Sequence, residues 1–198
     1  MYLSSFGQLD ADCFVKVKKQ HAEETKSIDF GDYSNIDSLN KYNEESRFDS
    51  LEAITDRTLK RVTKCKYPIS YLRTSENKKI ITNQIRSKFT LINFNYFFCD
   101  ACIQQLDDYV TIKKELKDMV TILVFFPEKQ KDIQLIIDKY RTFMEFIPDK
   151  KKYIEDYNLG VGTPLNLVLD KHQNVKYASC GANQKSGLLY IELIPHLK

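Results

Sequence analysis

The stretch that most constrains this chain runs from Lys88 to Cys102 and reads KFTLINFNYFFCDAC. Its residues 89–94 are mostly apolar, β-branched or aromatic, which is typical of a strand buried on both faces of a parallel sheet. Two cysteines, Cys99 and Cys102, follow with two residues between them. Apolar residues then recur every three or four positions up to residue 119, which predicts an amphipathic helix. The sequence therefore predicts a buried strand that runs into a pair of thiols and turns directly into a helix.

The order of elements after this stretch predicts an α/β domain. A second apolar run at 119–126 ends at Pro127. Because strand–helix–strand crossovers are right-handed, we expect this run and residues 89–94 to be neighbouring parallel strands. Two later strands flank turn residues at 170–174, which favours an antiparallel hairpin. The predicted elements from residue 89 onward are strands at 89–94, 119–126, 165–169 and 175–179, and helices at 103–119, 132–146, 150–157 and 184–197.

Residues 1–64 differ from the rest and are interpreted as a polar N-terminal extension. Residues 27–46 have no sustained periodicity, which indicates loops and short elements. An apolar set that includes Leu51, Ile54 and Val62 predicts a helix near 49–64. The extension could bind a partner, form a dimer or brace the main domain, and the sequence leaves these roles open. Residues 65–198 are assigned to the main domain, with short strand-like pieces at 66–72 and 79–85.

The composition excludes two classes of function. No uncharged apolar run of about 18 residues exists, so we expect no transmembrane segment. A net charge of only +3 argues against nucleic acid as a partner.

Residues 1–14 lack the basic start and apolar segment of a secretory signal. The sequence therefore leaves open an intracellular protein or a chain whose leader has been removed, and it does not indicate the oligomeric state.

The five cysteines point to thiol chemistry rather than to a disulfide scaffold. An odd number in a chain of this length is unlike the dense, even cysteine content of small secreted domains. A zinc site would need a second pair of ligands at short spacing, and the remaining candidates are isolated in sequence, so no metal is expected. Cys65 and Cys180 are predicted to be small buried apolar residues. The isolated candidates are Cys13, Cys65, Cys180, His21, His172 and His196.

These motifs, in this order, resemble the thioredoxin fold and in particular the TlpA-like thiol-disulfide oxidoreductases of bacteria, which are related to peroxiredoxins. The resemblance covers about residues 65–198. It rests on the strand TLINF, on Phe98 directly before Cys99, on Cys102, on the dipeptide Thr163-Pro164, and on the strand LNLVLD followed by a turn and VKY. The fold it implies is an α/β, thioredoxin-like three-layer α/β/α sandwich with a mixed sheet, here with an N-terminal extension.

The resemblance also implies roles for particular residues. Cys99, at a helix N-terminus whose amides stabilise a thiolate, is the expected attacking residue, and Cys102 is the expected resolving residue. In the family the proline that corresponds to Pro164 is cis, and with Thr163 it binds a substrate chain in an extended pose. Independently of the resemblance, the position of Tyr96, Phe97 and Phe98 just before Cys99 predicts that they contact the substrate. The expected partners are proteins with thiols or disulfides, and no cofactor is expected beyond the Cys99–Cys102 disulfide.

Several positions depart from the family pattern. Phe98 stands where a tryptophan is common, and Asp100-Ala101 stands where Gly-Pro or similar dipeptides are usual. Asn93 occupies a buried position where thioredoxins carry an aspartate. Gln105 stands three residues past the second cysteine, where the TlpA-like members often have a glutamate. Neither amide can act as a general base.

Two hypotheses of function follow. The first is an active thiol-disulfide oxidoreductase that reduces disulfides of partner proteins. The second is a thioredoxin-like interaction module with little redox turnover, in which the missing carboxylates leave the cysteine pair slow. A peroxidase is disfavoured because Tyr96 stands where a threonine would be needed. The family resemblance favours the periplasm or cell envelope if a leader was removed, and the cytoplasm otherwise.

Overall fold

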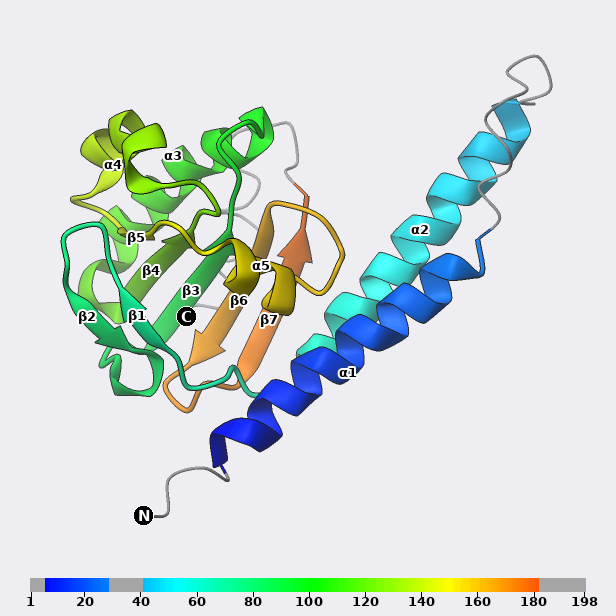
Figure 1. The fold of residues 1–198 in the computed structure, drawn as a ribbon, viewed down its shortest axis with the longest axis horizontal. Coiled ribbons are helices and arrows are strands. Elements are labelled where there is room, and N and C mark those ends of the chain that lie inside the picture. The colour runs from blue at the N-terminus through cyan, green and yellow to red at the C-terminus, as the bar shows by residue number, and fades with distance from the viewer. Residues whose placement is uncertain (1–5, 29–40, 182–198) are drawn as a thin grey trace.

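The computed structural model describes residues 6–28 and 41–181. Its centre is a mixed five-stranded sheet with the strand order β5-β4-β3-β6-β7 (Figure 1). The first three of these strands are parallel to one another, and β6 and β7 are antiparallel to their neighbours. The parallel pair predicted at 89–94 and 119–126 and the antiparallel hairpin predicted at 165–179 are confirmed. The strands are β3 (Phe89–Phe94), β4 (Val120–Phe125), β5 (Glu145–Ile147), β6 (Leu165–Asp170) and β7 (Val175–Cys180).

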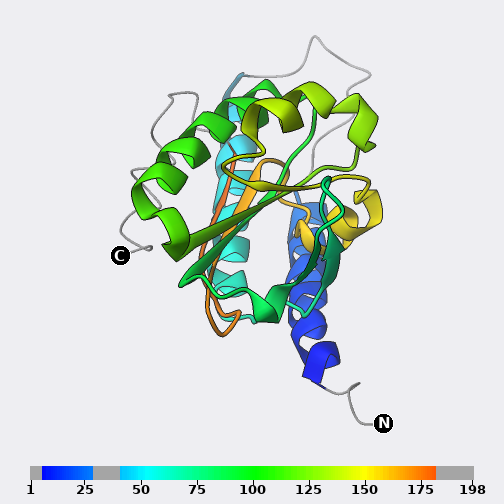
Figure 2. The ribbon, with the colours of Figure 1, turned by 90° about the vertical axis from the view of Figure 1, so that its left-hand side faces the viewer.

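Helices cover both faces of the sheet, so the predicted three-layer α/β/α architecture is confirmed. Figure 2 shows α3 (Asp100–Leu116) on one side of the sheet and α5 (Lys151–Tyr157) on the other. The helix α4 (Gln134–Tyr140) packs in the same apolar cluster as α3. A small antiparallel pair, β1 (Tyr71–Arg73) and β2 (Lys79–Ile81), contributes to the cluster on the α5 side. Short 3-10 helices lie at Thr82–Gln84, Lys117–Met119 and Gln130–Asp132.

The central strand β3 shows why its sequence is apolar throughout. All six of its residues are buried. Successive side chains of a strand point to opposite faces, so Phe89 and Leu91 enter the cluster beneath α3 while Ile92 and Phe94 enter the cluster on the other face. By the same alternation, Asn93 points to the α3 side. A polar side chain is thereby placed in the middle of an apolar layer.

The N-terminal extension contains more helix than the sequence indicated. Two helices, α1 (Phe6–Lys26) and α2 (Lys41–Val62), run antiparallel and side by side, with α2 next to β7 and α1 next to α5 (Figures 1 and 2). The helix expected near 49–64 therefore begins at Lys41, and the irregular structure expected for 27–46 is wrong for residues 41–46. Helix α1 was not predicted, although Phe14, Val17 and His21 are spaced as one buried face.

The burial predicted for Cys65 is confirmed, but the residue is not a free thiol. Its Sγ is bonded to the Sγ of Cys13 in α1, 52 residues earlier in the chain. The pairing was missed because only the antiparallel packing of α1 and α2 brings these two positions together. The disulfide fastens α1 to the point where the chain leaves α2 and enters the main domain.

The region predicted as one helix over 132–146 contains a shorter helix and a strand. The helix predicted over 132–146 is shorter, because α4 ends at Tyr140 and Glu145–Ile147 forms the parallel edge strand β5. An edge strand of three residues leaves too little periodicity to be recognised. The helix predicted over 184–197 lies outside the described residues. No helix in the described part of the chain combines the length and apolar character needed to span a membrane.

Candidate redox site

The two cysteines lie at the N-terminus of α3, as the sequence predicted. Cys99 is the N-cap of this helix, and the backbone N–H of Cys102 donates to Cys99 Sγ at 3.2 Å. The Sγ atoms are joined in a disulfide of 2.11 Å. Cys99 is half-buried, whereas Cys102 has no exposed surface. When the disulfide is open, the amide and the positive end of the helix dipole both favour a thiolate at Cys99.

The two residues between the cysteines form the first turn of α3. Asp100 is exposed and Ala101 is half-buried. An acidic residue in the first turn of a helix interacts favourably with the helix dipole. The same negative charge next to Cys99 opposes a second negative charge on its sulfur. Asp100 therefore stabilises the helix but disfavours ionisation of the Cys99 thiol.

Three aromatic residues precede Cys99 and differ in exposure. Phe98 is 88% exposed and Phe97 37%, and their ring centroids are 5.0 Å apart. Tyr96 is half-buried and packs against the cluster on the α5 side, and burial, followed by the charge of Glu128, raises its pKa. The backbone N–H of Phe97 donates to Glu128 Oε1 at 3.0 Å, which fixes the loop. The apolar surface beside Cys99 is therefore formed by Phe97 and Phe98.

The loop that contains Thr163 and Pro164 lies at the same end of the sheet as the cysteines. The first residue of β6, Leu165, pairs with Phe94, the last residue of β3. The chain before Leu165 and the chain after Phe94 are therefore neighbours. The Thr163–Pro164 peptide bond is cis, and the carbonyl of Pro164 accepts from Gly181 N at 2.9 Å. Thr163 is half-buried and Pro164 is buried.

The beginning of this loop touches the N-terminal extension. Gly160 has φ +78°, a conformation that glycine adopts at little cost. A Cβ atom at Gly160 would lie 3.3 Å from Cδ2 of His21 in α1. His21 is buried and its Nδ1 is 3.0 Å from Thr58 Oγ1 in α2. Burial lowers the pKa of His21. The two N-terminal helices thus pack against the chain that leads to Pro164.

Beneath α3, polar side chains form a hydrogen-bonded group that the sequence revealed only in part. Asn93 Nδ2 donates to Asn166 Oδ1 at 3.0 Å, and Gln105 Oε1 accepts from Tyr109 OH at 3.1 Å and from Asn166 Nδ2 at 3.4 Å. The Tyr109 hydroxyl also donates to Asn166 Oδ1. Asn93 and Gln105 were identified from the sequence. Asn166 and Tyr109 were not, although an asparagine inside an apolar strand signals a buried polar contact.

Cys180 is the free cysteine among the described residues. It is half-buried rather than fully buried, at the end of β7. Its Sγ donates to the carbonyl of Val161 at 2.8 Å. Burial raises the pKa of its thiol to about 11. Cys180 is therefore a poor nucleophile near neutral pH.

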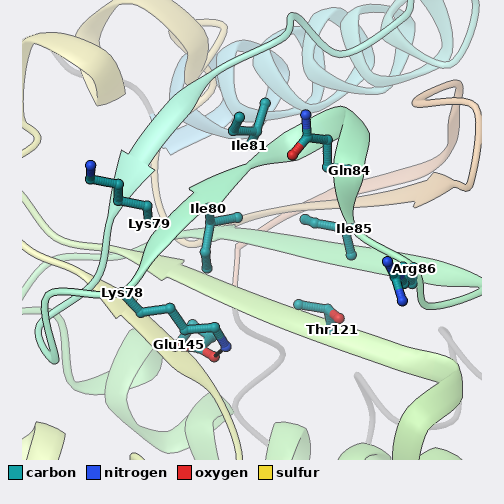
Figure 3. Close-up of a pocket in the computed structure, with 9 residues that line it drawn as sticks. All are labelled: Lys78, Lys79, Ile80, Ile81, Gln84, Ile85, Arg86, Thr121 and Glu145. Carbon is teal, nitrogen blue, oxygen red and sulfur yellow. Dashed lines mark hydrogen bonds and ion pairs between the residues drawn. The ribbon is translucent and has the colours of Figure 1, made fainter.

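A groove of about 420 Å³ is lined mainly by β2 and the residues that follow it (Figure 3). Its lining includes Thr121, near the start of β4, and the ion pair of Lys78 with Glu145. Because β3 and β4 are parallel and Cys99 follows the end of β3, this groove lies at the opposite end of the sheet. In the described ranges 6–28 and 41–181, no cluster of three or more His, Cys, Asp or Glu side chains has an arrangement suited to a metal ion.

Comparison with known proteins identifies the fold. No protein-family model and no curated protein matches the sequence. Solved structures do match, among them the thioredoxin domain of a thiol-disulfide oxidoreductase from Bacteroides vulgatus, with a TM-score of 0.55 at 16% identity over 68% of this chain and 97% of that one. The chain has a thioredoxin fold.

Two further thioredoxin-like structures extend the comparison. A thiol:disulfide interchange protein from a Bacteroides species matches with a TM-score of 0.54 at 16% identity, over 67% of this chain and 88% of its own. A thioredoxin-like protein from Bacteroides caccae matches with a TM-score of 0.54 at 13% identity, over 96% of this chain and 78% of its own. At these identities the likeness is one of fold, and it confirms the thioredoxin-like fold predicted from the sequence.

Proposed function

We propose that this protein is a thiol-disulfide oxidoreductase that reduces disulfides of partner proteins through Cys99 and Cys102. The observation that carries the proposal is the asymmetry of the pair. The two sulfurs are bonded to each other at a helix N-terminus, with Cys99 partly exposed and Cys102 fully buried. An attacking thiol must be accessible to a partner, whereas a resolving thiol only needs to reach Cys99. The solved oxidoreductases of the same fold support this assignment.

The reaction takes place in two exchanges. The thiolate of Cys99 attacks one sulfur of the partner's disulfide, so that a mixed disulfide forms and the other partner sulfur leaves as a thiolate and takes up a proton. Cys102 then loses its proton and attacks Cys99 Sγ, which closes the disulfide seen in the structure and releases the second partner thiol. The partner gains two electrons and the protein loses two. A dithiol donor must then reduce the pair again.

Trapping of the mixed disulfide tests this scheme. In a Cys102→Ser variant the second exchange cannot occur, so a disulfide-linked complex with a protein substrate such as insulin should accumulate. The complex should be visible on a non-reducing gel and disappear with dithiothreitol. The variant with both cysteines replaced by serine is the control, and it should form none. Absence of the complex in Cys102→Ser would contradict the proposal.

The exposed aromatic surface is proposed to bind the partner chain next to Cys99. Replacing Phe97 and Phe98 together by Ala should raise KM for a protein disulfide several-fold and leave the reduction of a small disulfide unchanged. The reason is that the two exposed rings are proposed to contact a protein substrate, whereas a small disulfide does not need them. The fold should be kept because Phe98 is 88% exposed and contributes little to the core. Phe48, 69% exposed on α2, offers a matched control substitution to Ala.

The backbone of Thr163 and Pro164, at the same end of the sheet, is proposed to pair with the extended substrate.

An interaction module with little redox turnover is the second candidate. The observation that favours it is that the hydrogen-bonded side chains beneath α3 are amides and a tyrosine, none of which can accept a proton near neutral pH. The rate of iodoacetamide alkylation of reduced Cys99 against pH separates the two candidates. The oxidoreductase predicts half-maximal reactivity clearly below pH ~8.5, the value for an ordinary thiol. Reactivity at or above that value would favour the module.

A further inference from the structure

Asn95 lies between β3 and the cysteines and contacts Cys102 directly. It has no exposed surface. Its Nδ2 donates to the carbonyl of Cys102 at 3.1 Å and to Asn93 Oδ1 at 3.0 Å. Both of these partners are acceptors, so the amide can have only one orientation. Asn95 therefore joins the resolving cysteine to the polar group beneath α3.

The other end of the same amide group has no partner. Asn95 Oδ1 is buried and accepts no hydrogen bond from any described residue. A buried acceptor without a donor is unfavourable, and such groups are rare in folded proteins. In the disulfide form Cys102 has no S–H, so it cannot be the donor. In the reduced form Cys102 gains an S–H donor, on the residue whose carbonyl the Asn95 amide already holds.

The polar group behind Asn95 is neutral and closely bonded. Asn93 donates to Asn166, which also receives the hydroxyl of Tyr109. Burial raises the pKa of Tyr109 well above its ordinary value, so it keeps its proton. Asn95, which this group holds through Asn93, can keep Cys102 in place and accept its hydrogen bond, but none of these side chains removes the proton of Cys102.

We infer that Asn95 is a positioning residue for the resolving step, holding the Cys102 carbonyl through Nδ2 and receiving the Cys102 thiol at Oδ1 when the disulfide is open. This inference rests on the proposed function. In the resolving step the Cys102–Cys99 bond forms, the bond from Cys99 to the partner sulfur breaks, and the proton lost by Cys102 is matched by the one that the departing partner thiolate takes up. Asn95 aims the Cys102 sulfur at Cys99 during this exchange.

The two exchanges can be timed separately with 5,5′-dithiobis(2-nitrobenzoate). Attack by Cys99 on the reagent releases one coloured thiolate, at a rate proportional to the concentration of the reagent. Attack by Cys102 on the resulting mixed disulfide releases the second coloured thiolate, at a rate independent of that concentration. The protein carries Cys180→Ser and is reduced with one equivalent of a phosphine. Alkylation followed by mass analysis verifies that the thiols released are Cys99 and Cys102 and that the Cys13–Cys65 disulfide is intact. Asn95→Val removes both ends of the amide.

The first release in Asn95→Val should stay within about twofold of the parent, and the second should slow about tenfold, the effect of one lost hydrogen bond. Thr58→Val, which removes a fully buried hydroxyl on α2 that bonds the carbonyl of Ile54 and makes no hydrogen bond with either cysteine of the pair, should alter neither phase. A second phase within about twofold of the parent, in a variant with native near-ultraviolet circular dichroism, overturns the inference. Absence of the first phase from the parent would instead overturn the proposed function.

A measurement on the unaltered chain covers the case in which Asn95→Val does not fold. In protein labelled with ¹⁵N-asparagine, the Asn95 side-chain amide resonances should shift between the disulfide and reduced forms. Those of Asn174, whose Nδ2 donates to Asp170 Oδ2 at 2.8 Å in the β6–β7 turn, should not. Unchanged Asn95 resonances would show that its oxygen gains no donor on reduction, and the inference would fail.

Discussion

Replacing Cys99 with Ser is expected to lower the catalysed reduction of insulin by dithiothreitol to the rate measured without protein. A serine hydroxyl is not ionised near neutral pH and does not attack a disulfide. No other described thiol can take over, because Cys102 has no exposed surface. The Cys180 thiol is poorly ionised, with its pKa raised to about 11 by burial. The measurement is the turbidity of precipitating insulin chains against time.

The matched control for this loss is Cys180→Ser. A serine hydroxyl can donate to the carbonyl of Val161 as the Cys180 thiol does, so the fold should be kept. This variant should reduce insulin at the rate of the unaltered protein. If Cys99→Ser retained that rate as well, the Cys99–Cys102 pair would not be the redox centre, and the interaction module would become the better account.

The features that could be predicted from the sequence are local ones. The strand at Phe89–Phe94 has six buried residues, and the helix that follows has the 3.6-residue period of a half-buried surface. Both patterns extend over enough residues to be distinguished from chance. The position of Cys99 at the helix N-terminus follows from them without knowledge of any distant contact. The thiol chemistry of the site could be predicted because Cys99 and Cys102 lie where the strand pattern ends and the helix pattern begins.

The features that could not be predicted depend on contacts between distant parts of the chain. Asn95 reads as one polar residue in a loop, and only the folded chain places its amide against the carbonyl of Cys102. Asn166 reads as a polar interruption of β6, and only the antiparallel pairing with β3 sets it opposite Asn93. The pairing of Cys13 with Cys65 is of the same kind. A count of the five cysteines does not show which of them lie close together in the folded chain.

Removing the Cys13–Cys65 disulfide is expected to lower the free energy of unfolding by about 4 kcal/mol, from the loop-entropy relation for the 52-residue separation of the two cysteines. The variant is Cys13→Ala with Cys65→Ala, which removes both sulfurs and leaves no unpaired thiol. Phe14 and Val17 of α1 are buried in the same cluster as Tyr67 of the main domain. These apolar contacts remain in the variant, so α1 should stay docked in the folded state, and the loss should come mainly from a less restricted unfolded chain.

Urea denaturation followed by circular dichroism measures this effect, with Cys99→Ser/Cys102→Ser as the control that removes the other disulfide. That pair closes a loop with a separation of only 3 residues, so its removal should cost much less. The Cys13–Cys65 disulfide should therefore contribute mainly to stability, and the Cys99–Cys102 disulfide mainly to catalytic turnover. An equal loss in both variants would contradict this division. An unchanged midpoint in Cys13→Ala/Cys65→Ala would mean that the packing of Phe14 and Val17 restrains α1 without the disulfide, and that the disulfide adds little to the stability of the fold.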